Sequence, residues 1–246
     1  MTIEWNGDGV RAGGTVERAF TVTRAGGAVP GILWQSSEAT GPAPLVLLGH
    51  GGSGHKRNER MVMLGQMFGE VLGWCAAAID GPVHGDRGPV TSSEDAEYRA
   101  LWQRDNPVQE MIDDWKSVLD ALSKLDGIDP GRIGYWGQSM GTMFGLPFIA
   151  SEARVKVAVL GKAGMTGMSP TRSGIAPTFE KFAPEVSQPV LFNMQWDDER
   201  FDRDGQIDLF DRIGAADKRL HAYPGIHGDN GPDAFVAQAD FLKRYL

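Results

Sequence analysis

Residues 132–145 read RIGYWGQSMGTMFG, an apolar strand-like run that passes through Gly137-Gln138-Ser139-Met140-Gly141 into a helix-like run. The pattern G-x-S-x-G is typical of a sharp turn from a strand into a helix, with the serine at its apex. Flanking glycines let the strand and the helix pass each other closely at such a turn. Ser139 could instead be a helix N-cap, since serine is a preferred residue there. The context favours a serine that projects from the carboxyl end of a strand, where open α/β sheets bind ligands.

Outward from this turn, short apolar runs alternate with helical patterns over most of the chain. The apolar runs are LVLLG, WCAAAID, RIGYWG, VKVAVLG, PVLFNM and RLHAYP. Continuous apolar strands separated by helices indicate a mostly parallel sheet with helices on both faces. We expect helices over Glu59–Leu72, Pro107–Leu125, Met140–Ser151, Gly205–Ile213 and Pro232–Tyr245.

The N-terminal part has a different pattern. Two β-rich stretches, Val16–Arg24 and Ala28–Ser36, flank the turn-forming pair Gly26-Gly27, which predicts an antiparallel hairpin. The predicted fold is therefore α/β, with a mostly parallel central sheet of about eight strands and an N-terminal hairpin. We expect one domain over residues 1–246, in which the aperiodic segment 163–184 is a candidate short lid.

Composition and charge narrow the class of protein. A net charge of −8 over 246 residues argues against a nucleic-acid partner, which would need a basic face. No segment has the roughly eighteen uninterrupted apolar residues of a membrane helix, and the N-terminus lacks the pattern of a signal peptide. The single cysteine, Cys75, stands in an apolar run and is expected to be a buried, unreactive thiol. We expect a cytoplasmic enzyme.

A nucleophilic serine needs a base to take its proton and an acid to orient that base. His227 lies in YPGIHGD, a loop just after the last predicted strand, where an imidazole is free to reach a neighbouring strand end. An acidic run that contains Asp197 and Asp198 follows the strand PVLFNM, and either aspartate could be the acid. His221 falls inside a predicted strand and is expected to fill a packing position.

The glycine-rich stretch LVLLGHGGSGHKRNER, residues 45–60, has two interpretations. Gly49–Gly54 fits G-x-G-x-x-G, the loop that cradles a dinucleotide pyrophosphate, and Asp80 would then be the ribose-binding acid of an NAD(P)-dependent oxidoreductase. His50-Gly51-Gly52 equally fits the loop that points a backbone N–H at a reacting carbonyl in serine hydrolases. The basic residues that follow could indicate a phosphate site, but an exposed helix start is favoured for them: Lys56, Arg57 and Arg60.

Taken together, these residues resemble the α/β-hydrolase superfamily, nearest to dienelactone-hydrolase-like and prolyl-oligopeptidase-like serine esterases. The matching pieces are His50-Gly51-Gly52, Asp80-Gly81-Pro82, His84-Gly85-Asp86-Arg87, Gly137-Gln138-Ser139-Met140-Gly141, Asp198 and Gly225-Ile226-His227-Gly228. The acid loop of this family usually reads D-x-x-V-P. Residues 198–202 fit that register with Phe for Val and Asp for Pro, which favours Asp198 over Asp197.

The resemblance implies an esterase mechanism without a metal or an organic cofactor. Ser139 would attack the carbonyl of a small ester, thioester or lactone, His227 would be the base, and Asp198 would orient it. The backbone N–H groups of Met140 and of Gly52 or Gly51 would hold the oxyanion. Dienelactone hydrolases use a cysteine where this chain has a serine, so their specificity is not implied.

The loop DGPVHGDR follows a predicted strand and gives two further candidates. His84 and Arg87 could line the pocket and bind substrate, or they could simply shape the turn. A third class of function, a non-catalytic ligand-binding module on the same scaffold, is disfavoured because all three positions of the triad are filled.

Overall fold

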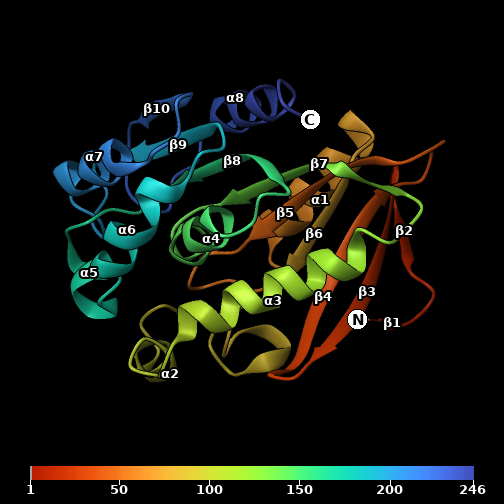
Figure 1. Ribbon diagram of the computed structural model, residues 1–246, viewed down its shortest axis with the longest axis horizontal. Coiled ribbons are helices and arrows are strands. Elements are labelled where there is room, and N and C mark those ends of the chain that lie inside the picture. The colour runs from red at the N-terminus through yellow and green to blue at the C-terminus, as the bar shows by residue number, and fades with distance from the viewer. Residues whose placement is uncertain (1) are drawn as a thin grey trace.

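The computed structural model describes residues 2–246, and ten strands within them form one twisted sheet (Figure 1). The strand order is β1-β3-β4-β6-β5-β7-β8-β9-β10, with β2 paired to β3. Their bounds are Ile3–Trp5 (β1), Val10–Ala12 (β2), Thr15–Arg24 (β3), Gly27–Ser36 (β4), Ala43–Gly49 (β5), Cys75–Ile79 (β6), Ile128–Gly137 (β7), Val155–Gly161 (β8), Val190–Gln195 (β9) and Lys218–Tyr223 (β10).

The predicted α/β architecture is confirmed, including the antiparallel hairpin β3–β4 and the parallel strands β5 to β10. The expected number of about eight strands was too low, because β1 and β2 add to the hairpin. Each of these two strands has only three residues, too few for an alternating pattern to be read.

The helices follow the predicted order but most end earlier. Their bounds are Glu59–Leu72 (α1), Ala96–Leu101 (α2), Pro107–Leu122 (α3), Met140–Ala150 (α4), Met168–Ser173 (α5), Ala176–Phe182 (α6), Arg203–Arg212 (α7) and Pro232–Leu242 (α8). The aperiodic segment 163–184 contains α5 and α6, and α2 lies in the connection that precedes α3. These helices have six or seven residues, fewer than two turns, so no periodicity marks them. That segment 163–184 moves as a lid stays a prediction.

Both faces of the sheet are buried, as the continuous apolar runs predicted. Along β5, Leu45 and Leu47 face a core layer shared with α3 and α4, whereas Val46 and Leu48 face a second layer shared with α1 and α8. Figure 1 shows α3 and α4 in front of the sheet. This two-sided burial aligns the carboxyl ends of the parallel strands along one edge, and the candidate site lies there.

The single cysteine of the chain lies in the core. Cys75 is buried at the start of β6, and burial raises the pKa of its thiol to about 11, so the prediction of an unreactive thiol is supported.

Among residues 2–246, no helix is both long and apolar enough to cross a membrane.

Candidate active site

The turn between β7 and α4 holds Ser139 in a strained backbone conformation. Its φ of 58° and ψ of −123° lie outside the regions that side chains other than glycine commonly adopt. The backbone N–H of Ser139 donates to the carbonyl of Gly161 at the end of β8. The start of α4 packs closely against the end of β5 and requires glycine at position 141, because a Cβ atom there would lie 2.3 Å from the carbonyl oxygen of Gly49. The predicted strand–serine–helix unit is therefore present, with the Ser139 hydroxyl at the carboxyl edge of the sheet.

The structure brings Ser139, His227 and Asp198 into one chain of hydrogen bonds. Nε2 of His227 lies 2.9 Å from Oγ of Ser139, and its Nδ1 lies 2.8 Å from Oδ2 of Asp198. The second carboxylate oxygen of Asp198 accepts the backbone N–H groups of Arg200 (2.8 Å) and Phe201 (3.0 Å). With its side chain only 1% exposed, Asp198 is fixed in orientation and holds the imidazole toward the serine.

The neighbouring aspartate is placed differently. The side chain of Asp197 is 62% exposed, and its nearest ionic partner is Arg203 at 4.0 Å. Of the two aspartates, Asp198, which the family register favours, is the one that contacts His227. His221, expected to fill a packing position, is half-buried on β10 and pairs in register with Asn193 of β9.

A buried lysine holds the loop that carries His227. Lys162 follows β8, is 1% exposed, and donates through Nζ to the backbone carbonyls of His227 (2.9 Å) and Asp229. Burial, with a smaller contribution from the nearby Arg60, lowers the pKa of Lys162 to about 7. The backbone N–H of His227 donates in turn to Glu199 (2.9 Å), so the loop is held at both its N–H and its carbonyl.

The glycine-rich loop after β5 lies against Ser139. A Cβ atom added to Gly51 would be 4.0 Å from that of Ser139, and Gly51 and Gly52 both line the same pocket. His50 fixes this loop: its Nε2 accepts the N–H of Gly81 (2.9 Å), so its Nδ1 donates to the carbonyl of Gly51 (2.8 Å). Burial lowers the pKa of His50 to about 4, which keeps the imidazole neutral at pH 7.

His84 and Arg87 are placed where they shape the loop, not where they line the pocket described below. His84 is fully buried, and its ring nitrogens lie 2.8 Å from the carbonyl of Pro82 and 3.0 Å from that of Gly52. Arg87 forms ion pairs with Asp114 (2.6 Å) and Glu110 (2.8 Å). The polar atoms of both residues bond to the chain itself. This favours the alternative that they shape the turn over the suggestion that they bind substrate.

The basic residues after the loop are not uniformly exposed, contrary to expectation. Arg57 is exposed, but Lys56 is buried and pairs with Asp80 (2.6 Å) and Asp86 (2.7 Å). Asp80 also accepts the backbone N–H groups of Lys56 and Asp86, so its carboxylate is occupied within the fold. The proposed ribose-binding acid of a dinucleotide site is therefore not available to a ligand.

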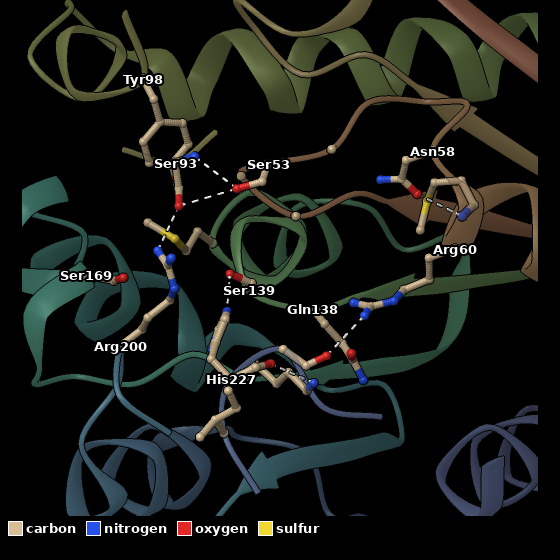
Figure 2. A pocket seen from close by; sticks show the side chains of 18 of the residues that line it. Ser53, Asn58, Arg60, Ser93, Tyr98, Gln138, Ser139, Ser169, Arg200 and His227 are labelled. Carbon is tan, nitrogen blue, oxygen red and sulfur yellow. Dashed lines mark hydrogen bonds between the residues drawn. The ribbon is translucent and has the colours of Figure 1, made fainter. Parts of the chain in front are cut away.

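A pocket of about 580 Å³ opens over Ser139 and His227. Its wall combines the glycine-rich loop with side chains from α1, the turn before α4 and the acid loop; Figure 2 shows most of them. The members that the sequence did not single out as site residues include Asn58, Arg60, Tyr98, Gln138, Met143, Lys162, Ser169 and Arg200. Proximity to a recognised motif could have pointed to four of them: Asn58, Arg60, Gln138 and Arg200. Nothing local marks the others. Among residues 2–246, no group of three or more His, Cys, Asp or Glu side chains is arranged to hold a metal ion.

Comparison with known proteins places the chain in a family. No protein-family model and no curated protein sequence matches the chain. A cold-adapted esterase from an Arctic intertidal metagenomic library, in a PEG-bound structure, is 36% identical, with 99% of each chain covered and a TM-score of 0.87. The native structure of such an esterase from that source is 32% identical over 99% of each chain, with a TM-score of 0.82.

More distant structures share the fold. An acetyl xylan esterase from Paenibacillus sp. R4 is 15% identical, with 99% of this chain and 89% of that chain covered and a TM-score of 0.73. Sequence identity of 36% to the Arctic esterase over the full length shows a shared family and not only a shared fold. The chain belongs to the α/β-hydrolase family and is a carboxylesterase-type hydrolase.

Proposed function

We propose that the protein hydrolyses esters of small carboxylic acids through an acyl-enzyme on Ser139. The observation that carries the proposal is the continuous hydrogen-bonded chain from Ser139 through His227 to Asp198. A serine hydroxyl is a weak nucleophile at neutral pH, and a neutral imidazole 2.9 Å away can remove its proton as the bond to carbon forms.

In the first half-reaction, Oγ of Ser139 attacks the ester carbonyl and its proton passes to Nε2 of His227. The backbone N–H groups of Met140 and of Gly52 or Gly51 would stabilise the negative charge on the carbonyl oxygen. His227 then gives the proton to the leaving alcohol, and the ester bond breaks. In the second half-reaction, water attacks the acyl-enzyme with His227 again as the base. The carboxylic acid leaves and Ser139 regains its proton.

The roles of the flanking groups follow from their contacts. Asp198 would keep the proton of the resting imidazole on Nδ1 and stabilise the imidazolium that forms in each step. Lys162 and Glu199 would position the His227 loop through its carbonyl and its N–H. A pocket of about 580 Å³ fits a small ester, thioester or lactone.

The test is a kinetic screen of 4-nitrophenyl esters of increasing acyl length, with thioesters and lactones in parallel. We expect short acyl chains to be favoured, and Ser139→Ala to lose at least about a thousandfold in kcat. Ser151→Ala makes the same change at the other end of α4 and should retain wild-type activity. Equal activity of wild type and Ser139→Ala would contradict the proposal.

A further inference from the structure

The pocket contains a polar side chain that the proposed hydrolysis does not use. Gln138 precedes Ser139, lines the pocket and is only 2% exposed. Neither its amide oxygen nor its amide nitrogen has a hydrogen-bond partner among residues 2–246. A buried amide without partners is costly to the fold unless a ligand supplies them.

A cationic side chain lines the same pocket. Arg60, in the first turn of α1, is half-buried, and its Nη2 lies 3.5 Å from the carbonyl of Gly228, at the limit of a hydrogen bond. No carboxylate of residues 2–246 lies within 4.0 Å of its guanidinium, although Glu59 and Glu199 also line the pocket. Burial, with no opposing carboxylate, lowers the pKa of Arg60.

The other arginine of the pocket is already satisfied. Arg200 donates to Ser93 (2.7 Å) and lies within 4.0 Å of Glu94 and Glu199. Figure 2 shows Arg60 and Gln138 on one side of Ser139, and Arg200 with Ser169 on the opposite side. The unpaired cation and the unpaired amide therefore share one arm of the pocket, which we call the Arg60 arm (Arg60 and Gln138).

We propose that the Arg60 arm binds a carboxylate carried by the ester substrate, so that the enzyme prefers acidic esters to neutral ones. The guanidinium presents a planar fork of N–H groups that matches the two oxygens of a carboxylate, and the Gln138 amide adds a donor. This inference rests on the proposed ester hydrolysis, because the carboxylate is placed relative to a scissile bond at Ser139. The group could belong to the acyl or to the alcohol part of the ester.

Two matched pairs of esters separate these sources. For the acyl part, mono-4-nitrophenyl glutarate is compared with 4-nitrophenyl pentanoate. For the alcohol part, 4-acetoxyphenylacetate is compared with 4-methylphenyl acetate. We expect wild type to prefer the acidic member of one pair by about tenfold or more in kcat/KM, and that pair identifies the part that carries the charge.

Substitutions in the Arg60 arm test its role. Arg60→Met should remove most of that preference, mainly by raising KM for the acidic ester. Gln138→Leu should reduce the preference several-fold without lowering Tm, because the buried amide has no partner to lose. A fall in Tm would instead mark Gln138 as a structural residue and contradict its role in the arm.

The matched control is Arg57→Met, which removes the same charge three residues earlier. Arg57 is exposed, pairs with Glu17 (2.8 Å) and lies outside the pocket, so the preference should stay at its wild-type value. The inference is overturned if wild type prefers neither acidic ester, or if Arg57→Met and Arg60→Met reduce the preference equally. Absence of Ser139-dependent hydrolysis of all four esters would instead overturn the proposed function, and this inference with it.

Discussion

Replacement of Asp198 by asparagine should trap the candidate base in the wrong tautomer. Oδ1 of Asp198 accepts two backbone N–H groups, from Arg200 and Phe201, so an asparagine would place its amide oxygen there. Its NH₂ group would then face Nδ1 of His227, now 2.8 Å from the carboxylate oxygen. Nδ1 would have to accept, the ring proton would move to Nε2, and the nitrogen that faces Ser139 could no longer take a proton.

The expected loss of activity has two causes: the change in the tautomer of His227, and the removal of the negative charge that stabilises the imidazolium. We expect kcat for a short-chain 4-nitrophenyl ester to fall by roughly a thousandfold to ten-thousandfold. Asp197→Asn changes the adjacent, exposed carboxylate and should stay within about threefold of wild type. Far-UV circular dichroism and Tm of each variant would show that the fold is kept. Asp198→Asn with more than a tenth of wild-type activity, or a larger loss for Asp197→Asn, would refute the reasoning.

Two further perturbations test the loop and the turn that frame the pocket. His50 takes up a proton only near pH 4 in the folded protein but near pH 6.5 in the unfolded chain, so its contribution to stability is lost as pH falls from about 6.5 to 4. Urea unfolding at pH 7.0 and 4.5 should show a fall in the free energy of unfolding that is larger in wild type than in His50→Gln by about 2 kcal/mol. An equal fall in the two proteins would contradict this. Gly141→Ala places a methyl group 2.3 Å from the carbonyl oxygen of Gly49. We expect the free energy of unfolding to fall by about 1–3 kcal/mol and much of the activity to be lost. Gly228→Ala, with no atom within 4 Å of the added methyl, should keep the wild-type Tm in the same thermal melts, and an equal loss in both would refute the packing argument.

The sequence predicted the features that depend on long apolar runs and on linked motifs. The strands from β3 to β10, the turn at Ser139 and the loop positions of His227 and Asp198 follow from periodicity and from strand ends. The short elements were missed, since strands of three residues and helices of six or seven leave too few positions for a pattern. The pairing of Asp198 rather than Asp197 with His227 depended on the register of one loop, which the family pattern supplied.

The lining of the pocket could not be predicted, because it is assembled from segments far apart in the chain. Arg60 and Lys162 reach the site from α1 and from the end of β8, and no local pattern links them to Ser139. Separation along the chain also explains why the burial of Lys56 was not predicted. Its partner Asp80 lies 24 residues away, so the local sequence indicated only an exposed helix start.

The central claim, that Ser139 is the nucleophile, is tested most directly by labelling with a fluorophosphonate and reading the intact mass. The account predicts one adduct per wild-type chain, localised to Ser139 by peptide mapping. It also predicts no adduct on Ser139→Ala and full labelling of Ser151→Ala. An unlabelled, folded wild-type protein, or an adduct that persists in Ser139→Ala, would contradict it.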